Sequence, residues 1–266
     1  MSRIGQVFEN LKRDGRKGLI AYITAGDPSP DRTPALVEAL VRGGADLIEL
    51  GVPFSDPIAD GPVIQRAGER ALKAGTSLRA VLEIAQQIRA TSEIPLLLFT
   101  YLNPVVRYGL ERLAADAAAA GIDGCLLIDA SVEEAEAYAA AMHRHNLDTV
   151  FLAAPTSTER RLKLVAQYST GFIYLVSRTG VTGEQEKVSA LIAPLIRNMR
   201  AVTTLPLAVG FGISKPEHVA ELGQQVEAVV VGSAIVRVIE KHAGPDLERH
   251  LEGFTRSLKD GFGAHA

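Results

Sequence analysis

The stretch ELGVPFSDPIADGP, residues 49–62, joins the end of an apolar segment to a loop that holds two aspartates and three prolines. The apolar residues of 46–50 surround Glu49, which is typical of parallel strands buried on both faces. We expect Glu49 to be half-desolvated at the carboxyl end of this strand, with its pKa raised towards neutrality. Asp56 and Asp60 follow in a loop that the prolines stiffen. The stretch therefore predicts catalytic carboxylates; the alternative is that Glu49 pairs with an arginine while both aspartates form turns.

Strand and helix patterns alternate on both sides of this stretch. Strands are expected at 19–24, 46–50, 95–100, 124–129, 149–152, 172–176, 206–209 and 228–231. Helices are expected at 2–13, 34–42, 63–74, 78–90, 110–120, 132–145, 159–167, 189–201, 216–222, 234–240 and 247–258. This alternation predicts an α/β fold, a single-domain (β/α)8 TIM barrel over residues 1–266 with an extra N-terminal helix covering one end. An open doubly wound sheet would require a GxGxxG fingerprint after the first strand, and 24–28 read TAGDP.

Composition limits the class of protein and its partners. Hydrophobic residues make up 47% of the 266 residues and the net charge is −3, so we expect a soluble globular protein with no nucleic-acid or membrane partner. Cys125 is the only cysteine, which excludes an intrachain disulfide, and its apolar surroundings predict a buried, unreactive thiol. The polar N-terminal segment and the lack of a long apolar run lead us to expect a cytoplasmic protein without a targeting or anchoring segment.

Polar residues and glycines follow the predicted strands, and barrel enzymes carry their chemistry at the carboxyl ends of strands. The residues expected to meet there are Glu49, Asp60, Tyr101, Asn103, Asp129, Tyr174, Gly210 and Ser233. Glycine-rich segments at 210–214 and 232–233 follow strands seven and eight, and each opens a helix. This pattern indicates a phosphate site, because small residues let backbone N–H groups reach phosphate oxygens; the alternative is a pair of tight turns.

The sequence lacks the residues that metal-dependent and Schiff-base chemistry require. His143 and His145 lie two apart on a helix and point away from each other, and the other histidines are scattered, so we expect no metal site. No lysine stands at a strand end, which argues against a Schiff base. Acid–base chemistry by carboxylates on a phosphorylated substrate remains. Tyr22 and Phe99, at strand ends, are available to flank a planar group, although core packing is equally consistent with either ring.

Five segments together resemble the tryptophan synthase alpha subunit: ELGVPFSDPIADGP (49–62), YLNP (101–104), SRTGVTG (177–183), GFGIS (210–214) and GSAIV (232–236). The resemblance covers nearly the whole chain. It implies retro-aldol cleavage of indole-3-glycerol phosphate to indole and glyceraldehyde 3-phosphate in the last stage of L-tryptophan biosynthesis. It also implies an α2β2 heterotetramer in which indole passes to a beta subunit that carries pyridoxal phosphate. This chain itself is expected to need no cofactor, because the protonated indole ring is the electron sink.

The resemblance also implies roles for individual residues. Glu49 corresponds to the general acid–base and Asp60 to the carboxylate that contacts the indole N–H, with Tyr174 beside Glu49 and Thr182 bonded to Asp60. The implied phosphate residues are Gly183, Phe211, Gly212, Gly232 and Ser233. The implied partner-facing residues are Asp56, Asn103, Pro104 and Asp129.

Two features leave room for alternatives or regulation. The family pattern has Asp, a hydrophobic residue and proline after strand four, whereas this chain has Asp129-Ala130-Ser131. This departure on the partner side keeps open a stand-alone lyase that releases free indole; a non-catalytic allosteric barrel is the other alternative. The loop 177–183 is too long for a minimal strand-to-helix turn and is a candidate lid.

Overall fold

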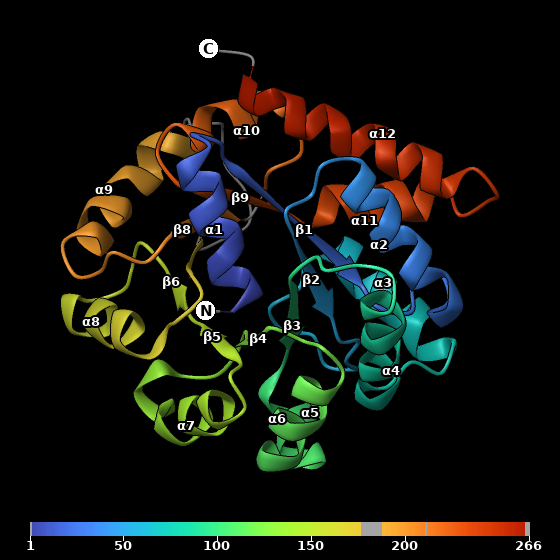
Figure 1. Ribbon diagram of the computed structural model, residues 1–266, viewed down its shortest axis with the longest axis horizontal. Helices are drawn as coiled ribbons and strands as arrows, with labels where there is room; N and C mark the ends of the chain where they lie inside the picture. The colour runs from blue at the N-terminus through green and yellow to red at the C-terminus, as the bar shows by residue number, and fades with distance from the viewer. Residues whose placement is uncertain (1, 177–187, 211, 264–266) are drawn as a thin grey trace.

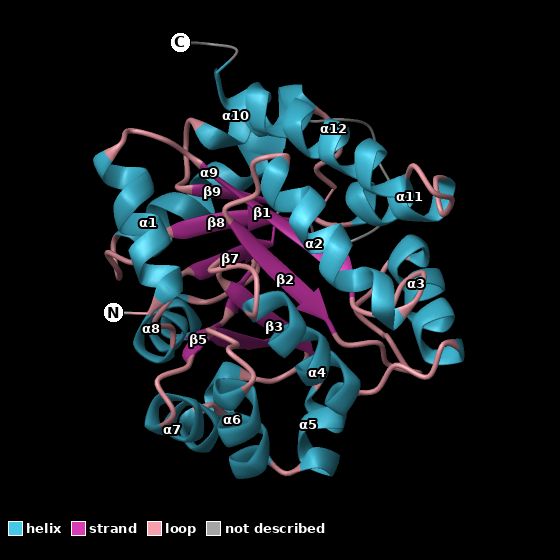
Figure 2. Cartoon of the chain, turned by 45° about the vertical axis from the view of Figure 1, so that its right-hand side comes forward, coloured by secondary structure: helices cyan, strands magenta, loops and turns pink. Residues whose placement is uncertain are grey.

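The computed structural model describes residues 2–176, 188–210 and 212–263, which form a barrel of parallel strands inside a ring of helices (Figure 1 and Figure 2). The strands are β1 (Gly18–Thr24), β2 (Leu47–Gly51), β3 (Leu96–Thr100), β4 (Gly124–Leu127), β5 (Asp148–Val150), β6 (Leu152–Ala153), β7 (Ile173–Val176), β8 (Leu207–Gly210) and β9 (Ala228–Val231). They pair in the order β5-β4-β3-β2-β1-β9-β8-β7-β6, always in parallel. The predicted α/β TIM barrel is confirmed.

One predicted strand, 149–152, is divided in two. Its first half, β5, pairs with β4, and its second half, β6, pairs with β7. Phe151 stands between the halves, so the chain changes hydrogen-bonding partners there and its two halves end the sheet on either side. The barrel therefore closes through a single stretch of chain that sequence periodicity alone presents as one strand.

The helices follow the strands in the expected alternation. They are α1 (Arg3–Arg13), α2 (Thr33–Arg42), α3 (Pro62–Lys73), α4 (Leu78–Arg89), α5 (Leu102–Tyr108), α6 (Leu110–Ala119), α7 (Glu136–Arg144), α8 (Glu159–Tyr168), α9 (Val188–Arg200), α10 (Pro216–Gly223), α11 (Ser233–Lys241) and α12 (Leu247–Asp260). Short 3-10 turns are η1 (Pro30–Arg32), η2 (Val132–Glu134) and η3 (Gly261–Gly263). Within the described residues, none of these helices is both long and apolar enough to cross a membrane.

Two helical segments differ from the sequence-based expectation. The YLNP segment, expected as a loop, turns helical at Leu102 and begins α5. Proline is tolerated there because the N–H groups of a first helical turn have no intrahelical acceptor. The Asp129 carboxylate accepts the backbone N–H of Leu102 at 2.7 Å and so caps this turn from the neighbouring strand end. The single helix expected over 132–145 is instead η2 followed by α7.

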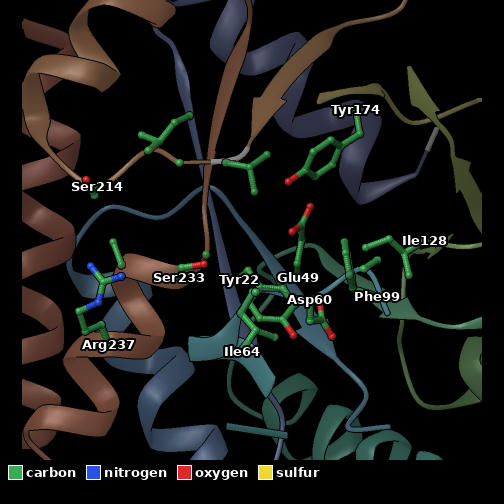
Figure 3. Close-up of a pocket in the computed structure, with 17 residues that line it drawn as sticks. Tyr22, Glu49, Asp60, Ile64, Phe99, Ile128, Tyr174, Ser214, Ser233 and Arg237 are labelled. Carbon is green, nitrogen blue, oxygen red and sulfur yellow. The ribbon is translucent and has the colours of Figure 1, made fainter. Parts of the chain in front are cut away.

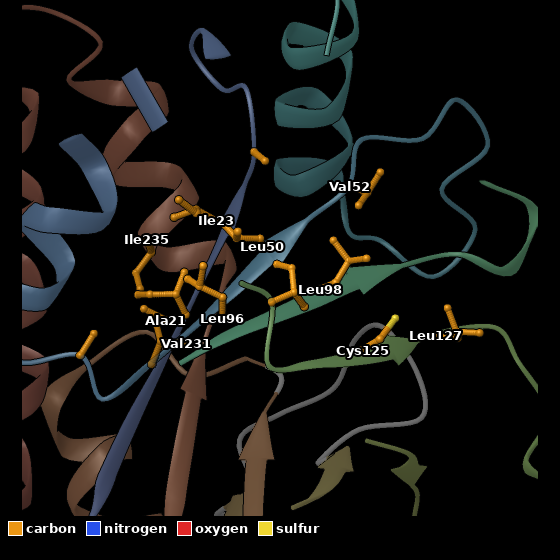
Figure 4. Close-up of a cluster of buried hydrophobic side chains, with 14 of the residues drawn as sticks. Ala21, Ile23, Leu50, Val52, Leu96, Leu98, Cys125, Leu127, Val231 and Ile235 are labelled. Carbon is orange, nitrogen blue, oxygen red and sulfur yellow. The ribbon is translucent and has the colours of Figure 1, made fainter. Parts of the chain in front are cut away.

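The strands separate two apolar cores because successive side chains point to opposite faces. Leu19, Ala21 and Ile23 of β1 face the helices with the rest of the outer core, part of which Figure 4 shows. Ile20 and Tyr22 face the barrel interior. The same alternation places Glu49 of β2 inside the barrel, two residues after the interior side chain Leu47 and paired in register with Tyr22.

Helix α1 closes one end of the barrel, as the sequence predicts (Figure 1). Its buried face carries Ile4, Phe8 and Leu11, and the Phe8 ring lies 5.6 Å from that of Phe172, next to the first residue of β7. These side chains join the interior core rather than the outer one. The interior is thus packed at the amino ends of the strands, and space for a ligand is left at their carboxyl ends.

Candidate active site

A cavity of about 250 Å³ opens at the carboxyl ends of the strands (Figure 3). It brings together eight residues that the sequence nominated: Tyr22, Glu49, Asp60, Phe99, Tyr174, Gly212, Gly232 and Ser233. Three further nominated residues, Thr182, Gly183 and Phe211, lie outside the described residues, as does the candidate lid at 177–183. Parallel strands deliver all eight to one mouth because their carboxyl ends share one rim.

Glu49 is buried more completely than expected, with only 1% of its surface exposed. Its Oε1 has no hydrogen-bond partner among the described residues, and the ion pairs found there do not include Glu49. Burial raises the pKa of Glu49 to about 8, because the anion loses its hydration without gaining a compensating charge. Among the described residues Glu49 therefore does not pair with an arginine, which was the alternative. At neutral pH Glu49 is an acid with a proton to donate.

Asp60 faces the same cavity from the loop that precedes α3. Tyr101 holds this loop: its hydroxyl accepts the N–H of Ala59 at 3.1 Å and is hydrogen-bonded to the Asp60 carboxylate. Burial raises the pKa of Asp60 to about 6, and the bond from Tyr101 works against that rise. Asp60 is therefore mostly ionised at neutral pH while Glu49 is mostly protonated. Two carboxyl groups held in opposite protonation states can act as a proton donor and an anionic stabiliser.

Aromatic rings form the walls around Glu49. Tyr22 and Phe99 meet edge to face with centroids 5.3 Å apart, and Tyr174 points its hydroxyl towards Glu49 from the opposite wall (Figure 3). Gly51 and Gly210 leave space for the tyrosines. A Cβ on Gly51 would lie 2.2 Å from the Tyr22 hydroxyl, and a Cβ on Gly210 would lie 2.0 Å from the Tyr174 hydroxyl. Glycine is required at these two strand ends because the tyrosine hydroxyls occupy the space of a side chain.

The opposite side of the cavity is small and polar. Gly212 has φ +76° and open space where a Cβ would stand, and Gly232 directly precedes Ser233 at the start of α11. The first N–H groups of a helix have no intrahelical acceptor, so an anion bound here would meet unpaired donors and the positive end of the helix dipole. Ser214 and Arg237 also line this side (Figure 3).

Several lining residues escaped sequence analysis. The cavity is also lined by the apolar side chains of Ala59, Ile64, Ile128, Ile213 and Val230. An apolar planar group fits such a lining, with charged groups at either end. Arg237 could have been found from its spacing, since it lies four residues after Ser233 on the same helix face. Tyr101 was placed at a strand end, but its bond to Asp60 depends on a loop conformation that spacing does not predict.

The residues nominated for a partner surface lie outside this cavity. Asp56, Asn103 and Asp129 are exposed and Pro104 is partly buried. Asn103 and Pro104 line a separate groove of about 450 Å³, whose other wall includes the segment 53–55. Two large apolar side chains border the same segments and were missed by sequence reasoning: Ile58 is 85% exposed and Val106 is 68% exposed.

No group of three or more His, Cys, Asp or Glu side chains in the described ranges has the arrangement of a metal site. Cys125 is buried, as expected, and burial raises the pKa of its thiol to about 12. The ionisable groups gathered at the cavity are therefore Glu49, Asp60, the three tyrosines around them and Arg237.

Comparisons with known proteins agree with this geometry. Residues 8–260 match the family model described as tryptophan synthase alpha chain. The chain is 78% identical to the tryptophan synthase alpha chain of Solibacter usitatus over the full length of both proteins, and 50% identical to that of Geotalea uraniireducens over 98% of both. The structure is similar to tryptophan synthase subunit alpha from Legionella pneumophila, with a TM-score of 0.91, 37% identity and 99% of each chain covered. A chain of Mycobacterium tuberculosis tryptophan synthase gives 0.89 and 37%, with 98% of each chain covered.

Proposed function

The chain belongs to the tryptophan synthase alpha chain family, and we propose that Glu49 and Asp60 perform its lyase reaction within the cavity at the barrel mouth. The enzyme cleaves indole-3-glycerol phosphate to indole and glyceraldehyde 3-phosphate in tryptophan biosynthesis. The observation that carries the residue assignment is the pair of buried carboxyl groups with separated pKa values, about 8 for Glu49 and about 6 for Asp60. The reaction needs one group of each kind.

The first step is protonation of the indole ring. The side chain cannot leave an intact aromatic ring, because the electrons of the breaking C–C bond need an acceptor. Protonated Glu49 donates its proton to the ring carbon that bears the side chain, which creates a cationic indolenine. Ionised Asp60 accepts a hydrogen bond from the ring N–H and stabilises the positive charge that develops there.

The second step breaks the C–C bond. Glu49, now a carboxylate, removes the proton from the side-chain hydroxyl next to the ring. The O–H electrons form the aldehyde carbonyl, the C–C bond breaks, and its electrons restore the aromatic indole. Glu49 is protonated again, so each cycle consumes no acid or base. Asp60 remains ionised throughout, which agrees with its lower pKa.

The substrate's ends fit the two sides of the cavity. The indole ring lies between Tyr22 and Phe99 on one side and Tyr174 on the other. The phosphate is held by Gly212, Gly232 and Ser233, which line the cavity, and the space beside Gly212 is open. By family resemblance Gly183 and Phe211 also bind the phosphate and Thr182 bonds to Asp60, all three outside the described residues.

The test is indole release from indole-3-glycerol phosphate by the purified chain. Glu49→Gln and Asp60→Asn should each lower kcat by about 10²–10⁴-fold, because each replacement preserves shape but removes proton transfer or charge. Circular dichroism should show an intact fold for both variants. Activity of Glu49→Gln within threefold of the parent would exclude Glu49 as the general acid–base.

A beta subunit carrying pyridoxal phosphate is the partner, in an α2β2 complex located in the cytoplasm. Support comes from the tryptophan synthase similarity and from the apolar side chains Ile58 and Val106 beside the groove that Asn103 and Pro104 line. A partner that covers these two side chains would remove exposed apolar surface from water. Indole release measured with and without a beta subunit distinguishes this assembly from a stand-alone lyase, and indole release by the isolated chain excludes a purely allosteric barrel.

A further inference from the structure

The small polar side of the cavity contains one full positive charge. Arg237 is the only cationic side chain among the described residues that line the cavity, whereas Glu49 and Asp60 supply two carboxyl groups. No ion pair or hydrogen bond joins Arg237 to another described residue. The other arginines packed near α11 are occupied: Arg66 and Arg70 both bind Glu240, at 2.7 Å and 3.0 Å.

Helix geometry directs Arg237 towards the start of α11. Residues four apart lie on the same helix face, and side chains lean towards the helix N-terminus. Arg237 follows Ser233 by four residues, so its guanidinium extends back along the helix to the cavity. Figure 3 shows the guanidinium on the side of Ser214 and Ser233, across the cavity from Glu49 and Asp60.

Backbone groups alone offset only part of the negative charge that the substrate's phosphate brings. A phosphate dianion brings two negative charges into a cavity that already contains ionised Asp60. The N-terminus of a helix contributes only about half of an elementary charge. A guanidinium supplies a whole charge and a fork of N–H donors that suits phosphate oxygens.

We propose that Arg237 binds the phosphate of the substrate and makes the enzyme specific for phosphorylated over unphosphorylated substrates. This inference depends on the phosphate site proposed at Gly212, Gly232 and Ser233. Arg237 completes that site: the backbone groups fix the position of the phosphate, and the guanidinium offsets its charge. The ion pairs of Glu240 with Arg66 and Arg70 keep α11 in place while leaving Arg237 free for the ligand.

The first measurement is calorimetric binding of glycerol 3-phosphate and, separately, of indole to the parent chain and to Arg237→Gln. Removal of a charge-assisted hydrogen bond should weaken glycerol 3-phosphate binding about 10- to 100-fold and leave indole binding within twofold. Arg237→Lys keeps the charge but not the fork of N–H donors, so its affinity for glycerol 3-phosphate should fall between those of the parent and Arg237→Gln. Lys241→Gln is the matched control, because it removes the same charge from the exposed surface one turn further along α11 and outside the cavity.

The second measurement is the reverse reaction, in which indole condenses with glyceraldehyde 3-phosphate or with unphosphorylated glyceraldehyde. The ratio of the two kcat/KM values should fall at least tenfold in Arg237→Gln, chiefly through a higher KM for the phosphorylated aldehyde. Equal losses for both aldehydes would show a structural defect and overturn the specificity role. If the parent binds glycerol 3-phosphate and Arg237→Gln binds it equally well, the proposed role of Arg237 is refuted while the phosphate site itself stands. Failure of the parent itself to bind glycerol 3-phosphate would refute the phosphate site as well.

Discussion

Glu49 shows how one residue's surroundings determine its chemistry. A glutamate on the barrel's interior face is enclosed by aromatic rings and has an oxygen without a hydrogen-bond partner among the described residues. Such a site is unfavourable for the carboxylate, so the protein keeps the proton at neutral pH. Asp60, less buried and bonded to Tyr101, keeps its charge. In our proposal, the different catalytic roles of the two carboxyl groups therefore come from a difference in their desolvation.

This arrangement should reduce stability in a defined pH range. The pKa of Glu49 rises from its ordinary value of 4.5 in the unfolded chain to about 8 in the folded chain. Between these values the folded state binds more protons than the unfolded state, so stability falls as pH rises from about 4.5 to about 8 and is unaffected by Glu49 below that range. Glu49→Gln removes the titration. We expect its free energy of unfolding to exceed the parent's by on the order of 1–3 kcal/mol at pH 7 and to differ little from it at pH 4.5.

Urea unfolding at several pH values measures this difference. Glu69→Gln makes the same chemical change at an exposed position of α3 and serves as the control, for which the parent's pH dependence should be retained. A stability difference between Glu49→Gln and the parent that stays constant from pH 4.5 to 8 would mean that Glu49 titrates alike in the folded and unfolded chains.

Sequence alone predicted the residues whose position follows from strand periodicity. Glu49, Tyr22, Phe99 and Tyr174 lie on strands, and alternation together with strand ends placed them at the cavity. Tyr101 received no role because its contact with Asp60 requires the folded loop 52–61. Arg237 received no role because a single arginine on a helix is usually a solvated surface residue; its four-residue spacing from Ser233 was the available signal, and the structure places it in the cavity.

At the scale of elements, α3, α11 and the end of β1 are joined by a network of charges. Asp27, three residues after Thr24 at the end of β1, is 1% exposed and accepts two hydrogen bonds from Arg70 of α3, at 2.7 and 2.8 Å. Arg70 and Arg66 also bind Glu240 of α11. Helix α3 follows the loop that carries Asp60, and α11 begins directly after Gly232. The network therefore joins the helices next to the two sides of the cavity.

Loss of Arg70 should be costly because it leaves a buried carboxylate without its partner. Arg70→Met is expected to lower the free energy of unfolding by about 3 kcal/mol. Arg66→Met removes a more exposed ion pair, 49% exposed at the arginine, and should cost less than about 1 kcal/mol. Urea denaturation of both variants measures these costs. Adding Asp27→Asn to Arg70→Met should recover part of the loss; equal costs for Arg66→Met and Arg70→Met would contradict the importance of the buried pair.

Element positions were predictable wherever apolar periodicity was long. The strand and helix expectations differ from the structure mainly in terminal residues, as at β2 and α2. The errors arose where long-range contacts decide. Helix α5 begins inside YLNP because Asp129, 27 residues away, caps it, and β5 separates from β6 because each pairs with a different neighbour. Neither cause is visible in a local pattern.

At the scale of the whole molecule, the packed core and the cavity lie at opposite ends of the barrel. Helix α1 seals the amino ends of the strands with Phe8 against Phe172. The carboxyl ends hold the cavity, and the loop after β2 serves two surfaces at once. Its residue Asp60 faces the cavity, while Ile58, two residues earlier, points into solvent with 85% of its surface exposed. A partner that covers Ile58 would therefore lie two residues from Asp60, to which we assign a catalytic role.

This proximity leads to a prediction about assembly. Val106→Asp and Ile58→Asp each replace an apolar side chain with a charged one at a position that, in our proposal, the beta subunit buries. Each should weaken association with the beta subunit at least tenfold, because a buried charge without a partner is strongly unfavourable. Val106→Asp should leave indole release by the isolated chain within twofold, since Val106 does not line the cavity.

Calorimetric titration of the beta subunit into each variant measures the association. Ser257→Asp, on α12 across the barrel from α5 in Figure 1, adds the same charge to an exposed surface and should bind the beta subunit as the parent does. Normal association of both Val106→Asp and Ile58→Asp would place the partner on another face of the barrel. If Val106→Asp binds weakly and loses its own activity as well, the groove wall and the cavity are mechanically linked through Tyr101, which precedes α5 and bonds to Asp60.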